Sequence, residues 1–146
     1  MSFRFALAPL LRLRQSIERQ RTLQLQEANL RVSNAREILA KLDRLLSESA
    51  QNDSAALSAG RTAAELRFAT VLRENLLHFR QELQSDLRRF ELLRQQAASA
   101  YHQAYREREV LEAVRARQRH DYQQEQLRRE QQELDAAHLL QRWHRK

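Results

Sequence analysis

The chain holds a single glycine, Gly60, and a single proline, Pro9. Turns between β-strands take most of their special backbone angles from these two residue types. A sheet of several strands therefore has almost no means of folding back between residues 61 and 146. Leu, Ala, Glu, Gln and Arg dominate the chain, and charged residues make up 31% of it, which is typical of coiled coils and long helices. The sequence predicts an all-α fold.

Apolar residues recur at helical spacing over about residues 9–50, and Pro9 suits a first helical position because its missing N–H costs nothing there. From Leu25 onward the spacing alternates between three and four, the heptad pattern of a coiled-coil seam. The seam expected for this helix consists of Leu10, Leu13, Ile17, Leu25, Ala28, Val32, Ala35, Leu39, Leu42 and Leu46. Small polar residues and Gly60 then predict a turn over about residues 51–61.

The second predicted helix spans about residues 62–142. Thr62 and Glu65 have the spacing of a capping box at its start. Its expected seam contains Ala69, Leu72, Leu76, Phe79, Leu83, Leu87, Phe90, Leu93, Ala97, Tyr101, Ala104, Leu111 and Val114. We therefore predict a single domain over residues 1–146, an antiparallel two-helix coiled-coil hairpin with a longer, partly projecting C-terminal helix.

The length of the second helix leaves two arrangements open. A first helix of about 40 residues covers only part of a second of about 80, because both rise equally per residue. Either the last third of the second helix projects alone, or the chain bends near Ala97–Ala100 to make a third helix. The lack of Gly and Pro there favours projection. An isolated helix gains little stability without packing, so a projecting one indicates a surface for a partner or a frayed tail.

The net charge is +7, and 24 of the 26 basic residues are arginines. A basic balance favours an acidic partner, which could be protein, nucleic acid or lipid headgroups. Acidic residues are interleaved throughout, so no block of like charge forms. The arginines of the C-terminal part could contact phosphates, but Asp121, Glu125 and Glu130 lie among them, so a solvated helix with intrahelical ion pairs is the better interpretation. We expect no nucleic-acid partner.

Several kinds of site are excluded by what the sequence lacks. There is no cysteine, hence no disulfide, zinc finger or thiol nucleophile. The five histidines include no pair at the spacing that brings imidazoles together on one helical face, and a lone Gly60 cannot build a phosphate loop. We expect no enzyme activity, metal or cofactor. The apolar run Phe5–Leu11 is too short for a signal peptide or a membrane span, so we expect a cytosolic protein.

Three apolar residues beside the seam, Ile38, Leu45 and Phe68, are expected near the same end of the hairpin, next to the turn. A shared apolar patch there would be a candidate docking face. A simple widening of the core stripe is the alternative interpretation.

The chain opens with Phe3-Arg-Phe-Ala-Leu-Ala-Pro-Leu-Leu-Arg-Leu-Arg14, followed by Glu18. It closes with Glu107-Arg-Glu-Val-Leu-Glu-Ala-Val-Arg115, Tyr122-Gln-Gln-Glu125 and Arg128-Arg-Glu-Gln-Gln-Glu-Leu-Asp135. These runs resemble the two ends of the FliJ family of flagellar export proteins. Length, the central polar turn and the arginine-rich tail agree, so the resemblance covers essentially the whole chain.

The resemblance implies a cytoplasmic component of the flagellar type III export apparatus, peripheral to the inner face of the cell membrane. Members form an antiparallel two-helix coiled coil similar to the stalk of rotary ATPases. The stalk inserts into a ring of the export ATPase FliI and promotes its assembly and activity. It also contacts the cytoplasmic part of the gate protein FlhA and escorts export chaperones. The resemblance implies no hydrolytic role for the stalk itself.

By analogy with the family, two sets of residues are expected to meet partners. The gate would contact residues near the turn: Ile38, Leu42, Leu45, Phe68 and Leu72, of which Leu42 and Leu72 also belong to the expected seam. The ATPase ring would contact exposed charge on the paired terminal helices: Arg4, Arg12, Arg14, Arg115, Arg117, Arg119, Arg128 and Arg129. The rival hypotheses are the stalk of a virulence type III secretion system and a basic helical adaptor for nucleic acid or anionic membrane.

Overall fold

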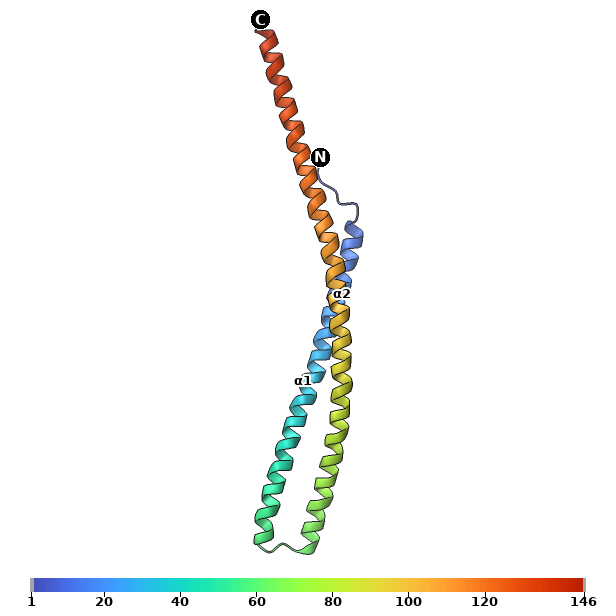
Figure 1. Ribbon diagram of the computed structural model, residues 1–146, viewed down its shortest axis with the longest axis vertical. Helices are drawn as coiled ribbons and strands as arrows, with labels where there is room; N and C mark the ends of the chain where they lie inside the picture. The colour runs from blue at the N-terminus through green and yellow to red at the C-terminus, as the bar shows by residue number, and fades with distance from the viewer. Residues whose placement is uncertain (1, 146) are drawn as a thin grey trace. The chain divides into compact units, whose positions relative to one another are not determined.

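The computed structural model describes residues 2–145, which form two helices, α1 (Ala8–Ser58) and α2 (Ala63–His144), and no strand. Both are shown in Figure 1. The prediction of an all-α helical hairpin is confirmed. α2 is one unbroken helix, so the alternative of a third helix beginning near Ala97–Ala100 is wrong. The chain divides into two compact units, residues 1–20 with 102–146 and residues 21–101.

The unit of residues 21–101 contains the turn and the helix segments on either side of it. Its three buried residues are Val32, Ala35 and Leu42, which follow one another at heptad spacing along α1 and so lie on one face. Half-buried apolar residues flank them on both helices: Leu25, Ala28, Leu39, Leu46, Leu76, Leu83, Leu87 and Phe90. The apolar contact is a narrow seam, as binary patterning with a single apolar stripe dictates.

Ion pairs between the two helices define how they run within this unit. Arg36 pairs with Glu91 at 2.8 Å, and Asp43 accepts a hydrogen bond from Arg80 at 2.6 Å. As the residue number rises along α1, its partner's number falls along α2, so the helices are antiparallel. These pairs flank the seam, where charged groups at coiled-coil edges fix partner and orientation.

The turn begins later in the sequence, and is shorter, than predicted. α1 ends at Ser58 rather than near residue 50, because the polar stretch before Gly60 contains Ala and Ser but no helix breaker. Gly60 then adopts a φ of 83°, a left-handed conformation that favours glycine at helix ends. The capping box is confirmed: the Glu65 amide donates to Thr62 Oγ1 at 3.3 Å, and the Thr62 amide donates to Glu65 Oε2 at 3.2 Å.

The second unit packs the N-terminal end of α1 and the segment before it against α2. Phe5, Leu11 and Ala104 are buried there, and the ring of Phe3 meets that of Tyr122 with centroids 5.7 Å apart. Residues 2–5 have no regular structure. The Ala8 amide donates to the Phe5 carbonyl at 3.1 Å, which joins this lead-in segment to the start of α1.

The predicted seam is wrong at several positions. Leu10 and Leu13 are exposed and Leu11 is buried, with 3% of its surface accessible. On α2, Leu72, Phe79 and Leu93 are exposed, whereas the basic residues Arg73 and Arg80 are half-buried. The reason is the same in each unit: cross-helix contacts, which neither helix's own periodicity contains, select which neighbouring residue turns inward.

Candidate protein-docking surfaces

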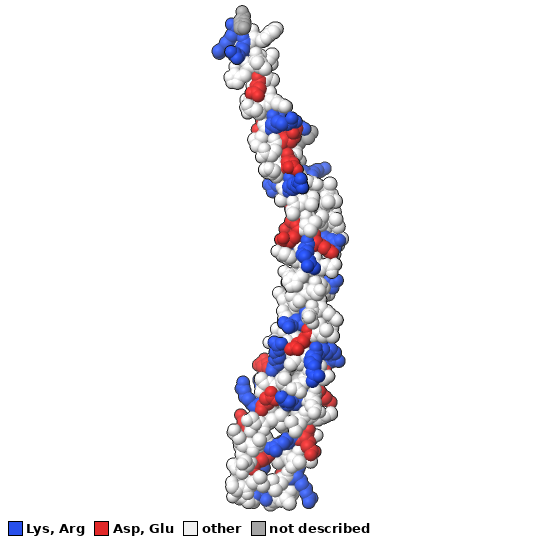
Figure 2. Space-filling view, viewed as in Figure 1, with Lys and Arg blue, Asp and Glu red and all other residues white. Residues whose placement is uncertain are grey.

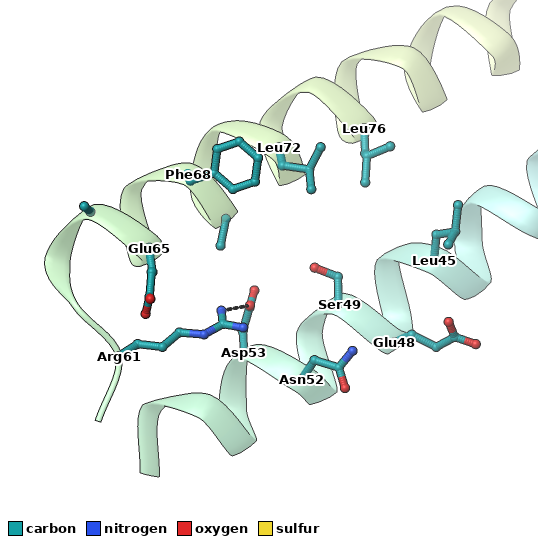
Figure 3. A pocket seen from close by; sticks show the side chains of 12 residues that line it. Leu45, Glu48, Ser49, Asn52, Asp53, Arg61, Glu65, Phe68, Leu72 and Leu76 are labelled. Carbon is teal, nitrogen blue, oxygen red and sulfur yellow. Dashed lines mark hydrogen bonds and ion pairs between the residues drawn. The ribbon is translucent and has the colours of Figure 1, made fainter. Parts of the chain in front are cut away.

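A groove opens between the two helices beside the turn, within the unit of residues 21–101 (Figure 3). It has a volume of about 960 Å³. Its apolar side chains are Leu45 from α1 and Phe68, Leu72 and Leu76 from α2. In Figure 3 Leu72 and Leu76 point toward α1 across the groove, and the ring of Phe68 lies along α2. The facing positions on α1 include Ser49, too small to fill the space, and the groove therefore stays open.

A charged cluster occupies the end of the groove nearest the turn. The Asp53 carboxylate accepts hydrogen bonds from Arg61 at 2.9 Å and from Arg73 at 2.5 Å. Glu48 and Glu65 also line the groove. The combination of an apolar floor with a polar rim is the anatomy of a protein interface.

The structure brings together three of the five residues expected to contact the gate: Leu45, Phe68 and Leu72 all line the groove. Phe68 is 72% exposed, far more than a residue that merely widens a core stripe. Ile38 is also exposed but does not line the groove. Leu42 is 4% exposed and packs between the helices, so its side chain offers no surface to a partner.

A second hollow, of about 850 Å³, lies in the other unit, between the lead-in segment, the start of α1 and α2. Arg4, Arg12 and Arg115 line it together, so the structure gathers three of the eight arginines expected at the ATPase ring. Phe3, Phe5 and Leu11 are among its apolar lining residues. Among residues 2–145, no acidic side chain lines this hollow.

Other arginines of that set are held by acidic partners. Arg14 forms an ion pair with Glu107 across the two helices. Arg128 and Arg129 both donate to Glu125, at 3.0 Å and 3.1 Å. The Arg128 guanidinium, followed by that of Arg129, lowers the pKa of the exposed Glu125 carboxyl below its ordinary value. These intrahelical pairs stabilise an exposed helix modestly.

Arg117 and Arg119 are exposed, and among residues 2–145 neither has an ion-pair partner. In the space-filling view, basic and acidic side chains alternate over most of the visible face (Figure 2).

The best-connected charged residue of this unit, Arg108, is not among the residues predicted to meet a partner. Arg108 pairs with Glu18 on α1 and with Glu112 one turn along α2, the latter at 2.6 Å, and its guanidinium lies 5.0 Å from the centroid of the Tyr105 ring. The hydrogen bond to Glu18 is the main cause that raises the pKa of Arg108. The spacing of four residues from Arg108 to Glu112 was the available signal in the sequence, and the pair with Glu18 had none.

A long stretch of α2 carries no covering segment. Every described residue from Leu127 to Arg145 is exposed, including five large apolar side chains: Leu127, Leu134, Leu139, Leu140 and Trp143. Trp143 is 84% exposed. Together these uncovered apolar side chains make the stretch a candidate interaction site.

Two further findings bear on the kind of site. Within residues 2–145, no group of three or more His, Cys, Asp or Glu side chains could hold a metal ion. No helix in the described part of the chain has a stretch both long and apolar enough to cross a membrane.

The model of the family described as "Flagellar FliJ protein" matches residues 3–146, nearly the whole chain. No curated protein and no solved structure matches.

Proposed function

Because the chain belongs to the FliJ family, whose members are components of the flagellar export apparatus, we propose that it is the stalk that joins the export ATPase to the export gate. In this role the unit of residues 1–20 and 102–146 enters the ring of a FliI-like ATPase and promotes its assembly and activity. The groove beside the turn contacts the cytoplasmic part of a FlhA-like gate protein. Export chaperones are further partners, and the chain itself catalyses no reaction.

The observation that carries this proposal is the uncovered stretch of α2 from Leu127 to Arg145. A helix in water without a packed face is only marginally stable, yet this one continues to His144. A ring that encloses the helix would cover it on all sides. This suits a stretch whose apolar residues, such as Leu134, Leu140 and Trp143, do not lie on a single face.

The arginines around this stretch support the same partner. Arg115 and Arg119, four residues apart, share one side of α2, and Arg117 lies on the opposite side, since residues two apart are separated by about 200° around a helix. A flat partner would reach only some of them, whereas an enclosing ring reaches all three. Their lack of ion-pair partners within the described chain leaves them free for acidic groups of a partner.

The groove beside the turn supports contact with the gate. Three apolar side chains from two helices, Leu45, Phe68 and Leu72, face one opening, and burial of large exposed apolar groups is the main favourable term in association. We propose that Ile38 extends this contact along α1. Leu42 supports it from within, because it packs the helices behind the groove.

The test is ATP hydrolysis by the cognate export ATPase with and without this protein, together with a pull-down of the two. Stimulation that saturates well below one chain per ATPase subunit supports a single stalk per ring. A variant lacking residues 127–146 should bind and stimulate less while keeping the helical content of the remaining chain.

Absence of both binding and stimulation would contradict the proposal. Affinity for nucleic acid or anionic vesicles that falls steeply with salt would then favour a basic adaptor. We do not expect that outcome, because acidic residues interleaved with the basic ones would repel an anionic partner.

A further inference from the structure

We propose that the hollow lined by Arg4, Arg12 and Arg115 is a receptor for a short segment of a partner protein in which an acidic residue neighbours an apolar one. For the partner's identity, the export ATPase, the inference rests on the proposed function. The residues that line the hollow determine the chemistry of the segment.

The lining of the hollow is positively charged. Two other arginines of the same unit meet acids: Arg14 pairs with Glu107, and Arg108 with Glu18. Here three guanidinium groups line one opening without an acidic lining residue, and no ion pair holds Arg4, Arg12 or Arg115 within residues 2–145. The hollow around Arg36, by contrast, contains its own acid, Glu91. Guanidinium groups bind carboxylates with strong, often bidentate hydrogen bonds.

The apolar lining indicates which kind of anion would bind in the hollow. Phe3, Phe5, Ala6, Ala8, Pro9 and Leu11 form more than half of the lining residues. A free phosphate ion would use the arginines and leave this surface wet. A peptide segment that carries a carboxylate next to an apolar side chain would use both, because apolar burial adds to the charged contact. A volume of about 850 Å³ accommodates a few side chains of such a segment, within the range of ligand pockets.

The lead-in segment builds one wall of this hollow. Phe5 is buried at its base, and the Leu11 amide donates to the Leu7 carbonyl at 2.9 Å where the helix starts. Phe3 contacts Tyr122 of α2 with ring centroids 5.7 Å apart. Arg4 lies between these two aromatic anchors, so Phe3 acts as a positioning residue that holds Arg4 over the hollow.

The probe is a set of fluorescent peptides of about 15 residues that together cover the sequence of the cognate export ATPase. Binding to the full-length protein is measured by fluorescence anisotropy at about physiological salt. We expect peptides with an acidic-apolar pair to bind, and to lose binding when either the acidic residue becomes its amide or the apolar residue becomes Ala.

The variants Arg12→Glu and Arg115→Glu should each weaken this binding by about tenfold or more, the size expected for hydrogen bonds to charged groups. Arg106→Glu is the matched control. It changes the same charge on the same helix at an exposed position outside the hollow, and should change affinity by less than about twofold. Phe3→Ala should also weaken peptide binding. Adding Arg115→Glu to the Phe3→Ala variant should weaken binding further. Circular dichroism of each variant should show unchanged helical content.

Three outcomes would overturn the inference. The first is an equal loss with Arg106→Glu, which would make the binding a general charge effect. The second is binding of vesicles rich in phosphatidylglycerol that depends on Arg12 and Arg115 when no peptide binds, which would identify a lipid surface as the ligand. The third is stimulation of the ATPase that is indifferent to Arg12→Glu and Arg115→Glu, with no peptide bound. In that case the stalk function would stand and the receptor would not. Peptide binding without any stimulation by the full chain would instead contradict the stalk function alone.

Discussion

Asp53 of α1 and Arg73 of α2 form a hydrogen-bonded ion pair at 2.5 Å across the helices beside the turn. The same carboxylate also binds Arg61, at 2.9 Å, just after the turn. One acidic side chain therefore ties the end of α1 to both the turn and α2. It does so where the apolar seam is replaced by an open groove, so charge rather than packing sets the separation of the helices there.

Replacing Asp53 with Ala should loosen this end of the hairpin. We expect a double-mutant cycle with Arg73→Ala to give a coupling free energy of about 0.5–1 kcal/mol, because both side chains are partly exposed and screened by water. Thermal unfolding followed by circular dichroism measures it. The matched control is the cycle on Arg89 and Asp86, a pair within α2, whose loss should leave the turn unaffected. Equal amide exchange at residues 59–66 in both single Asp variants would contradict the assignment.

Replacing Leu45 and Phe68 together with Asp should weaken binding of the cytoplasmic part of the gate and leave helical content intact. Both side chains are more than half exposed, so the folded state loses little packing. The control is Leu42→Asp, which buries a charge in the seam and should lower the unfolding temperature strongly. A collapse of helicity in the Leu45 and Phe68 variant would mean that these residues are core.

Reversing the charge at Arg115, Arg117 and Arg119 should impair stimulation of the export ATPase. None of the three has an ion-pair partner within residues 2–145, so their reversal breaks no internal contact. Reversal of Arg128 and Arg129, which share Glu125, removes an internal pair as well and should also lower the helicity of the tail. Unchanged stimulation in the first variant would move the ring contact elsewhere.

Protonation of Glu125 should weaken the exposed tail of α2 at low pH. Arg128 and Arg129 lower the pKa of this carboxyl, so its stabilising contribution is present above the ordinary glutamate pKa. It is lost as the pH falls through the lower, folded-state pKa. An NMR titration should give Glu125 a midpoint below that of an unstructured glutamate. Arg128→Gln with Arg129→Gln should return the midpoint to the ordinary value, and an identical midpoint in both proteins would refute the pairing.

Much of the fold follows from local rules in the sequence. The scarcity of Gly and Pro predicts long helices, and Thr62 with Glu65 predicts the start of α2 because a capping box needs only residues three apart. The end of α1 was harder to predict. The stretch from Ser47 to Ser58 is polar but contains no breaker, so the helix continues until Gly60 supplies the left-handed residue.

The inward-facing residues were predictable only where the contacts between the helices follow the heptad pattern. Val32, Ala35 and Leu42 are at heptad positions and are buried. At Leu72 the pattern fails, because Arg73 turns inward to meet Asp53. Such a contact joins residues twenty positions apart in the sequence, and no periodicity within α2 encodes it.

The candidate surfaces, too, were predictable from the sequence only in part. The arginines and the apolar residues near the turn could be named from their types and positions. The grouping of Arg4, Arg12 and Arg115 around one hollow could not, because it depends on the path of an irregular segment fixed by Phe3 on Tyr122.

The uncovered stretch of α2 separates two kinds of evolutionary constraint along one chain. At Leu42 and Ala104, a substitution is judged first by whether the protein still folds. From Leu127 to Arg145 no packing partner exists within the described chain, so most polar substitutions there would leave protein abundance unchanged. Any sequence preference in that stretch therefore reflects selection for binding a partner and not selection for folding.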